Sequence, residues 1–496
     1  MPGRRQPRDL PEPAPAPAAP LPEPAFSEIL SRLGIVVRPP DLTGEPLVWE
    51  PPLFSDAATP VPIATAPPVL SSARALVQRE RWGEAKIAQG LAPQYLYSDA
   101  KGMITHHITS EKPESGRLEV MVGEAAWAIV DAFDTSTAYM HLAFSAYAAR
   151  PDRQRPWAEE MQIRGSDLMK ALGLWDRKDL TRAEKVLRII EQARLLNSLA
   201  VTVSYGLPNS SRVNLSVSRM WEVSYEIAGQ RHLVTSDEAL PLGDPLADVI
   251  PDEVILHVKP GSWARFFLNR AGLSDGSSLY WFSYLATTVF QIDPYREPIA
   301  SKLAVFLTLT LGPQNPRRKV KTLIEYAFSP EEQRATQRDR DARYNVKQAF
   351  DNALYVLSQA GWRISFPEAS YPANLVPAWA RPDGSASQGR LPQGYYQTFL
   401  RAVLEVWPPG DIPQRLAANR TSLSGGKRPK TRGRQLTGEE IRQGREALGM
   451  SQKQLGDILG RSQAWVAKIE HGTRTPSPED LARLRAVLDK SGGARA

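Results

Sequence analysis

Two polar side chains near the C-terminus, Gln463 and Lys468, have the chemistry needed to distinguish one base pair from another. A glutamine amide can donate to one base atom and accept from another, so it can pair with N6 and N7 of adenine. A lysine ammonium can reach a guanine edge or a phosphate. A basic cluster upstream is suited to phosphate contacts through its charge alone. The cluster comprises Lys427, Arg428, Lys430, Arg432 and Arg434.

Capping residues predict the short helices that would position these side chains. Thr437 with Glu440, and Ser451 with Gln454, have the spacing of capping boxes, in which a hydroxyl and a side-chain carbonyl satisfy the first free N–H groups of a helix. Glycines then provide the helix ends. The predicted starts are Thr437, Ser451, Ser462 and Ser477, and the predicted ends are Gly449, Gly460 and Gly472.

From Ile441 to Leu488 the sequence resembles the helix-turn-helix of the Cro and phage-repressor (XRE) type. That family has the pattern S-Q-x-x-L-A-x-x-L-G, then a helix, then I-E-x-G-x-x-x-P-s-x-x-x-L. Gly456 stands where the family usually has alanine, a loss of about 1 kcal/mol in helix propensity. The matching positions are Ser451-Gln452, Leu455-Gly456, Leu459-Gly460, Ile469-Glu470, Gly472, Pro476 and Leu481.

The resemblance implies a domain of four to five helices over residues 436–490 that binds double-stranded DNA with its third helix in the major groove. It implies that Gln452 holds a phosphate or a base edge, and that Arg445 and Glu470 tie helix one to helix three by an ion pair. A four-helix module that binds another protein is the alternative. The DNA-binding candidates are Gln452, Ser462, Gln463, Ala464, Trp465 and Lys468.

Composition sets broad limits on the remaining chain. It has 496 residues, 42% of them apolar and 23% charged, and no cysteine, so disulfides and thiolate metal sites are excluded. No run of 18 apolar residues and no signal peptide occur, so we expect a cytoplasmic protein, associated with nucleoid or plasmid, that has no membrane partner. The net charge is +7, and the segment from Arg415 to Lys490 carries 16 basic and 8 acidic residues. The C-terminal end is therefore the expected nucleic-acid end.

The preceding chain predicts a mainly α-helical protein with small β wings. Residues 1–70 are rich in proline and alanine and predict a disordered arm. Residues 100–260 predict a first winged-helix-like domain, with a long helix over 124–148, a capping box at Thr181 and Glu184, and three strands after residue 199. Its third helix has a basic flank, which is a candidate DNA contact or a solvated face. That flank comprises Lys185, Arg188 and Gln192.

Residues 261–408 predict a second winged-helix-like domain. Helices are expected over 279–292, 298–311, 320–326 and 338–360, and strands at 362–366 and 403–407. Arg340, Arg343 and Lys347 share one face of the long fourth helix and are candidate DNA contacts. Residues 409–435 predict a flexible basic linker, which either lies along phosphates or keeps the domains apart.

Two winged-helix units in tandem resemble the replication initiators of bacterial plasmids, in plan rather than in motif. The first hypothesis is therefore a non-enzymatic, sequence-specific DNA-binding protein that binds origin repeats as a homodimer or a DNA-dependent oligomer. A transcriptional regulator with a large dimerisation or sensing body is the alternative. No catalytic residue, metal ligand or cofactor is predicted. A DNA-nicking enzyme that uses His106, His107 and Tyr344 is the third hypothesis, and against it stands the fact that adjacent histidines on a strand point to opposite faces.

Overall fold

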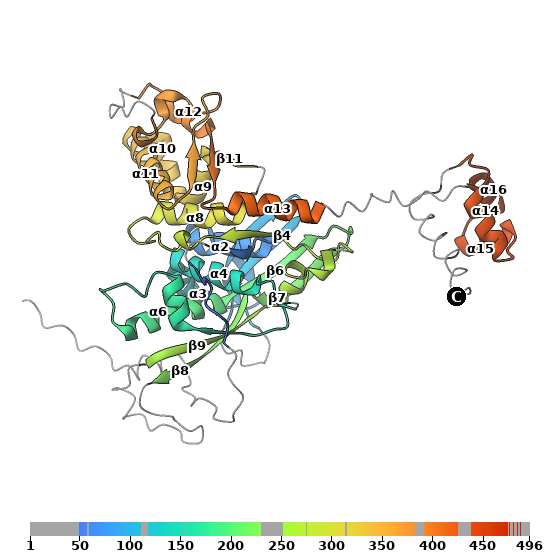
Figure 1. Cartoon of the computed structure of the whole chain (residues 1–496), viewed down its shortest axis with the longest axis horizontal. Coiled ribbons are helices and arrows are strands. Elements are labelled where there is room, and N and C mark those ends of the chain that lie inside the picture. Colours follow the sequence, from blue (N-terminus) through green and yellow to red (C-terminus); the bar gives the residue numbers. More distant parts are fainter. Residues whose placement is uncertain are drawn as a thin grey trace, which may run out of the picture. The chain divides into compact units, whose positions relative to one another are not determined.

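The computed structural model describes residues 49–56, 59–110, 118–153, 155–229, 251–273, 275–312, 315–381, 391–424 and 438–474, and positions 476, 480, 484 and 487. The chain forms two compact units, a body that ends at Ala417 and a C-terminal unit that begins at Ala418 (Figure 1). One continuous hydrophobic core runs through the body from Leu53 to Val406. The C-terminal unit has a separate core.

The body begins before the predicted end of the N-terminal arm. Strand β1 (Val61–Ala64) pairs antiparallel with β10 (Phe282–Leu285), and helix α2 (Pro67–Val77) follows with a proline in its first turn. Ile63 and Val69 are fully buried. The predicted arm is therefore too long at its C-terminal end, and the part of it before residue 49 lies outside the described residues.

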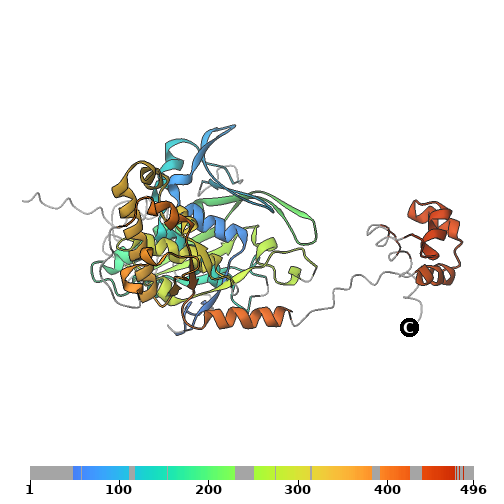
Figure 2. The same ribbon diagram turned by 90° about the horizontal axis from the view of Figure 1, so that it is seen from above.

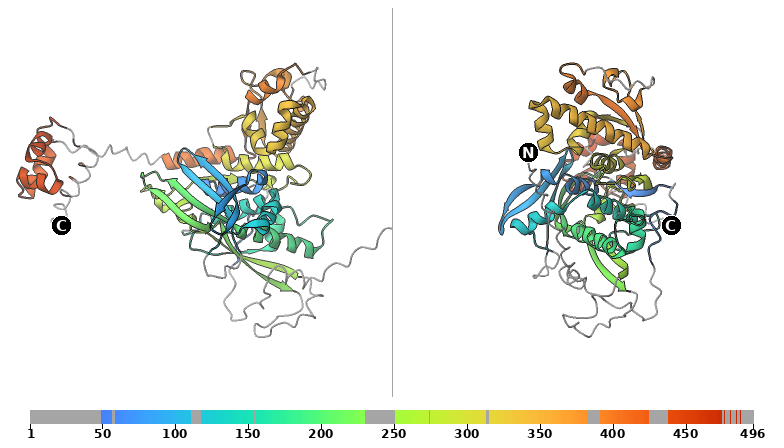
Figure 3. Two further views of the ribbon diagram at one scale, coloured as in Figure 1. Left: turned by 180° about the vertical axis from the view of Figure 1, so that it is seen from behind. Right: turned by 90° about the vertical axis from the view of Figure 1, so that its left-hand side faces the viewer.

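A five-stranded antiparallel sheet is the largest sheet among the described residues, and the sequence did not predict most of it. Its order is β2 (Gly83–Ile87), β3 (Gly90–Asp99), β4 (Gly102–Ile108), β6 (Leu199–Gly206) and β7 (Arg212–Arg219). The left view of Figure 3 shows the blue and green strands of this sheet side by side. Strands β4 and β6 are far apart in the sequence, so local pattern could not reveal their pairing.

The predicted first unit is present with one break in its first helix. Residues 124–148 form two helices, α3 (Gly123–Ala132) and α4 (Thr135–Ala148), because the Asp134 carboxylate accepts a hydrogen bond from the Thr137 N–H at 2.8 Å and starts a new helix. Strand β5 (Met161–Arg164) and helix α5 (Gly165–Ala171) follow. The capping box at Thr181 and Glu184 opens α6 (Arg182–Ser198), as predicted.

A three-stranded sheet completes this unit. Strands β8 (Trp221–Gly229) and β9 (Pro251–Pro260) form a hairpin, and the sheet order is β5-β9-β8. Strand β5, which lies between α4 and α5, thus pairs with the last strand, and the β8–β9 hairpin follows α6 after strands β6 and β7. This arrangement is compatible with the predicted winged-helix plan.

A similar order of elements recurs in the second half of the body, interrupted by α10 (Pro330–Arg338) and α12 (Tyr395–Arg401). Helix α8 (Pro298–Thr310) precedes strand β11 (Arg317–Lys319) and helix α9 (Val320–Ala327), and the long helix α11 (Arg340–Gln359) precedes β12 (Arg363–Ser365) and β13 (Val403–Trp407). The sheet order is β11-β13-β12, so here too the first strand pairs with the last. In Figure 1 these elements form the upper part of the body.

Three predictions for this half of the chain were wrong or incomplete. Residues 279–292 do not form one helix: Phe282–Leu285 form strand β10, in which the buried side chains Ser283 and Leu285 alternate with less buried ones, and Thr287–Val289 form a short 3-10 helix. Helix α10 (Pro330–Arg338), opened by a capping box at Ser329, was missed. Helix α13 (Ile412–Ser424) occupies part of the predicted flexible linker, and Ile412 and Leu416 in it are buried.

Two histidines are buried in the core of the body. The ring of fully buried His106 lies edge-on to Tyr95, with centroids 5.8 Å apart, and neither ring nitrogen has a hydrogen-bond partner among the described residues. The Nδ1 of His141 accepts a hydrogen bond from the indole of Trp221 at 2.9 Å, and its Nε2 donates to the Val69 carbonyl at 3.0 Å. Burial lowers the pKa of His106 to about 3 and that of His141 to about 4.

We expect the stability of the protein to fall as pH drops from about 6.5 toward 4. The unfolded histidines have a pKa of about 6.5, so near pH 5 the unfolded state binds about two protons that the folded state excludes. Each such proton adds about 1.4 kcal/mol per pH unit to the slope of unfolding free energy against pH. His106→Phe should remove one of these contributions, as measured by urea unfolding between about pH 4.5 and 6.5.

His471→Gln provides a control for this measurement, because His471 is exposed in the C-terminal unit. The control should leave the slope unchanged. Equal slopes for His106→Phe and the unaltered protein would show that His106 is not held neutral in the folded state.

Candidate nucleic-acid interface

Three short helices of the C-terminal unit pack around a small apolar core, and Figure 2 shows these helices as red ribbons. They are α14 (Gly438–Ala447), α15 (Gln452–Leu459) and α16 (Gln463–Glu470). The capping box at Ser451 and the cap at Ser462 are present as predicted, whereas Thr437 and Ser477 lie outside the described residues. The buried core comprises Ile441, Leu455, Leu459, Trp465, Val466, Ile469 and Leu484.

The turn between α15 and α16 is tight. Gly460 adopts a positive φ of 67° at the end of α15, where glycine is favoured. A Cβ on Gly456 would lie 2.7 Å from the carbonyl oxygen of Arg461, which is closer than real side chains approach. Gly456 is the residue that departs from the family pattern, and the backbone of the turn passes too close to it to leave room for a side chain.

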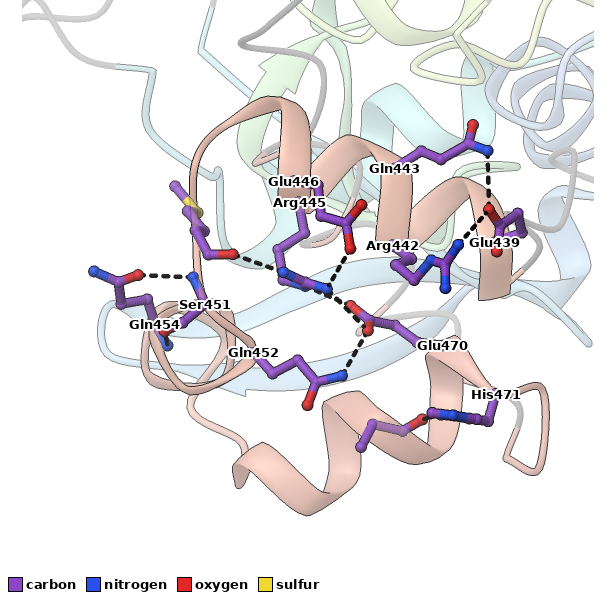
Figure 4. Close-up of polar contacts among 12 residues, drawn as sticks. Glu439, Arg442, Gln443, Arg445, Glu446, Ser451, Gln452, Gln454, Glu470 and His471 are labelled. Carbon is purple, nitrogen blue, oxygen red and sulfur yellow. Dashed lines mark hydrogen bonds and ion pairs between the residues drawn. The ribbon is translucent and has the colours of Figure 1, made fainter.

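An ion pair joins α14 to α16, as the resemblance implied (Figure 4). The Arg445 Nε donates to the Glu470 carboxylate at 2.7 Å and a second guanidinium nitrogen donates at 3.2 Å, so the contact is bidentate. The Arg445 guanidinium also donates to the Met450 carbonyl at 2.7 Å. The side chains of Arg445 and Glu470 are 10% and 1% exposed, so both charges are largely removed from water.

Gln452 completes this contact from α15. Its amide nitrogen donates to the second carboxylate oxygen of Glu470 at 2.8 Å (Figure 4). Burial opposes ionisation of Glu470, but the hydrogen bonds from Arg445 and Gln452 outweigh it, and the pKa of Glu470 lies below its usual value. The hydrogen bond to Glu470 raises the pKa of Arg445. Gln452 was predicted to hold a phosphate or base edge, and in this structure its amide N–H₂ group supports the ion pair.

Helix α16 presents a polar face to solvent. Gln463, Ala464 and Lys468 are exposed, while Val466 and Ile469 are buried on the other side. The hydroxyl of Ser462 is also exposed, and it accepts a hydrogen bond from the Trp465 N–H. These exposed side chains meet the geometric requirement for a helix that enters a groove.

Trp465 does not share that face. Its side chain belongs to the core of the unit and is 8% exposed, and the Arg461 guanidinium lies over its ring, 5.6 Å from the centroid. The prediction of Trp465 as a DNA contact was therefore wrong. A tryptophan three residues after a helix start falls on the inward face when Val466 and Ile469 also point inward.

Lys347 in the body was also wrongly predicted as a DNA contact. Its side chain is 2% exposed, its ammonium lies 2.5 Å from the Asp351 carboxylate, and the ring of Phe399 lies below it. Burial raises the pKa of Asp351 to about 6, although the charge of Lys347 opposes this shift. An ammonium held in this way is engaged inside the fold and cannot reach a phosphate.

The other two candidates on α11 have different positions. Arg343 is half-buried and its guanidinium donates to the carbonyls of Thr336 and Gln337 at the end of α10, at 2.6 and 3.1 Å. It satisfies helix-terminal carbonyls rather than facing a ligand. Arg340 is exposed at the first position of α11 and stays a candidate.

The basic flank of α6 is engaged within the body. The Lys185 ammonium donates to the Trp175 carbonyl at 2.7 Å, and the Gln192 side chain accepts from the Thr137 hydroxyl at 2.5 Å. The Arg188 guanidinium lies 5.9 Å from the centroid of the Tyr295 ring. The structure therefore favours an intramolecular role for this flank.

The remaining candidates are separated or lie outside the described structure. The basic cluster from Lys427 to Arg434 falls outside the described residues. On β4, His106 is buried while His107 lies half-buried, 3.1 Å from the Thr202 hydroxyl, so the two imidazoles face opposite sides of the sheet.

Among the described residues no group of three His, Cys, Asp or Glu side chains is arranged to hold a metal ion. No described helix is long and apolar enough to cross a membrane.

Residues 437–496 match the family model for a helix-turn-helix domain. The match supports DNA binding by the C-terminal unit, and it leaves the body outside its bounds. No curated protein and no solved structure matches the chain.

We expect Arg445→Met to destabilise a fragment of residues 430–496 by about 3 to 5 kcal/mol, because it leaves the buried Glu470 carboxylate without its countercharge. Thermal unfolding followed by circular dichroism measures this loss. Arg442→Met is the matched control on the same helix, since the Arg442–Glu439 pair is about half exposed and such pairs contribute less than about 1 kcal/mol. Equal melting temperatures for the two variants would contradict the assignment.

Proposed function

We propose that this chain is a non-enzymatic, sequence-specific double-stranded DNA-binding protein that reads base edges with the exposed face of α16. The observation that carries the proposal is the outward position of Gln463 and Lys468 on a helix fixed by the Arg445–Glu470 pair. The helix-turn-helix match supports the same ligand. Gln463 lies at the helix start, where a docked helix contacts base edges.

Gln463 and Lys468 have separate tasks in this proposal. The Gln463 amide pairs with adenine N6 and N7, which discriminates one base pair. Lys468 lies one turn or more further along α16 and contacts a guanine edge or a phosphate. Ser462 and Ala464 line the same exposed face, where the small side chain of Ala464 permits close approach to the groove.

Gln452 contributes to the same surface indirectly. Its amide nitrogen is engaged by Glu470, so its role on the free protein is to hold α15 against α16. Its amide oxygen makes no hydrogen bond to any of the described residues and is the atom left for a water-bridged or direct contact to DNA. The proposal therefore assigns base discrimination to Gln463 and positioning to Gln452.

We further propose that the DNA is a set of origin repeats and that the protein initiates replication of a plasmid-type replicon, acting as a homodimer or a DNA-dependent oligomer. The recurrence of one strand order, β5-β9-β8 and β11-β13-β12, supports a tandem winged-helix body of this kind. Regulation of transcription is the second candidate, favoured by the helix-turn-helix unit itself.

Gln463→Ala should weaken binding to the specific site by about 1 to 3 kcal/mol and leave non-specific binding nearly unchanged, because it removes one base contact. Gln443→Ala is the matched control, since this exposed amide lies on α14 and contacts Glu439. Isotherms with the specific duplex and a scrambled duplex measure both effects. Equal weakening of the two duplexes would exclude α16 as the reader.

Replacing the basic residues of the cluster from Lys427 to Arg434 by serine should have the opposite effect. These side chains would bind through counterion release, in which each neutralised phosphate adds about 0.9 to the slope of log affinity against log salt concentration. The variant should bind all DNA more weakly and show a flatter slope. A slope equal to that of the unaltered protein would contradict a phosphate-contact role.

Footprinting on the DNA that flanks the gene separates the two biological roles. Origin binding predicts protected direct repeats spaced near one helical turn, about 10 to 10.5 base pairs, beside an A·T-rich stretch. Regulation predicts one protected palindrome over a promoter. A single palindrome without repeats would overturn the initiator proposal and leave DNA binding intact.

A further inference from the structure

Arg74 on α2 is a half-buried cation to which the described fold supplies no anion. It is the only charged side chain of α2, and its Nε is buried. Its side chain makes no hydrogen bond and no ion pair to any residue that the structure describes. A guanidinium presents five N–H donors in a fixed fork, and leaving a buried donor without an acceptor costs free energy. A cation held in this state is typical of a binding site for an anion.

Two aromatic rings hold the Arg74 guanidinium in place. Its central carbon lies 5.5 Å from the centroid of the Tyr97 ring on β3 and 5.4 Å from that of the Phe306 ring on α8. Aromatic faces attract a cation without accepting its N–H groups in the ring plane, so the fork is oriented while its donors stay available. Figure 1 shows α2 next to α8, and the two helices pack against each other. The guanidinium therefore lies where the two halves of the body meet.

A buried hydroxyl belongs to the same cluster. The ring of Tyr326, in the last turn of α9, lies 4.5 Å from the ring of Phe306 at an interplanar angle of 31°. Its hydroxyl is buried and has no hydrogen-bond partner among the described residues. Burial raises the pKa of Tyr326, and the nearby charge of Arg74 opposes this shift. The phenol thus stays protonated near neutral pH and can donate one hydrogen bond.

Gln78, one turn after Arg74 on α2, fixes the surrounding elements. Its side-chain amide donates to the Tyr326 carbonyl at 3.0 Å and accepts from the Tyr95 hydroxyl at 2.9 Å. The Gln78 side chain is buried, so both hydrogen bonds are shielded from water. They join α2 to α9 and to β3, and they set the positions of these elements before any ligand binds. Such preorganisation lowers the entropic cost of binding.

Further positive charge surrounds the cluster. Lys302 precedes Phe306 by one turn on the same side of α8, is half-buried and has no ion pair among the described residues. Arg81 is exposed, and its guanidinium donates to the Glu325 carbonyl. Together with Arg74 these side chains provide three cations.

Negative charge in this region is largely committed to other partners. Asp99, at the end of β3, accepts hydrogen bonds from the Tyr205 hydroxyl and from the Lys101 N–H. The other acidic side chains of α9 and of the adjacent 3-10 helix η1 (Arg79–Arg81) lie in exposed pairs, Lys321–Glu325 and Arg79–Glu80, at 3.7 Å each. The two pairs cancel, and three cations against the single charge of Asp99 leave an excess of two positive charges.

We propose that Arg74, Lys302 and Tyr326 form a binding site for the phosphate group of a small molecule, where the two halves of the body meet. The guanidinium fork binds two phosphate oxygens, an arrangement for which arginine is suited. Tyr326 supplies a neutral donor, and Lys302 supplies a second charge. A phosphate monoester carries nearly two negative charges at pH 7, which matches the local excess, whereas a carboxylate carries one. The site belongs to the body and is independent of DNA binding by α16.

Calorimetric titration of the full chain with inorganic phosphate and with glycerol 3-phosphate tests this site, at a fixed ionic strength set by chloride. Both probes should bind saturably at one site per chain. Arg74→Met should weaken the binding of each probe about 10- to 150-fold, because it removes charge-assisted hydrogen bonds. Tyr326→Phe, which removes one oxygen atom, should weaken binding about 2- to 10-fold.

Arg79→Met is the matched control. It removes the same charge from η1, where the Arg79 guanidinium is exposed and donates to the Asp131 carbonyl. This variant should bind both probes with unchanged affinity. Circular dichroism without phosphate checks that each variant is folded, and Tyr326→Phe together with Arg74→Lys provides the same test if Arg74→Met does not fold.

Three results would overturn the proposal. The first is the lack of saturable binding by the unaltered protein, and the second is an equal loss of affinity in Arg74→Met and Arg79→Met, which would indicate general attraction by surface charge. The third is displacement of bound phosphate by a DNA duplex, which would identify the anion as the DNA backbone rather than a small molecule. The titrations with phosphate alone contain no DNA, so their failure leaves the proposed reading of bases by α16 standing.

Discussion

The Glu470 carboxylate is the contact on which the geometry of the C-terminal unit depends. It lies at the end of α16 and accepts hydrogen bonds from Arg445 on α14 and Gln452 on α15, so one buried group joins all three helices. A buried carboxylate is costly unless charge and hydrogen bonds compensate it. The arrangement that compensates Glu470 also fixes the rotation of α16, and it thereby decides that Gln463 and Lys468 face outward.

The same requirement for partners divides the polar side chains of this protein into two groups. Lys347 and Arg343 have charges that suit a phosphate, but one is bonded to Asp351 and the other to the carbonyls that end α10. Their polar atoms already have partners inside the fold. Exposed side chains such as Gln463 and Lys468 keep their hydrogen-bonding capacity for a ligand. Charge alone is therefore a poor guide to DNA contacts on α11, because burial and existing hydrogen bonds decide which side chains can reach a ligand.

The two halves of the body show how one topology can have different surfaces. Both pair the first strand of a three-stranded sheet with its last strand, β5 with β9 and β11 with β13. In the first half, α6 packs against neighbouring segments that engage Lys185 and Gln192, and in the second half α11 keeps one face open. The five-stranded sheet that extends from β2 to β7 belongs to the first half only, which gives that half additional packed surface.

Local patterns in the sequence determined the helices that carry their own signals. The capping boxes at Thr181 and Ser451, the N-cap at Ser462 and the apolar spacing in α11 and α16 each depend on residues within one or two turns, so they were predicted correctly. The Arg445–Glu470 pair was implied by resemblance and not by spacing. Only the tertiary structure decided the pairing of β4 with β6 and the burial of Trp465 and Lys347. These features depend on contacts between segments distant in sequence, because a side chain becomes core or surface only when another element packs against it.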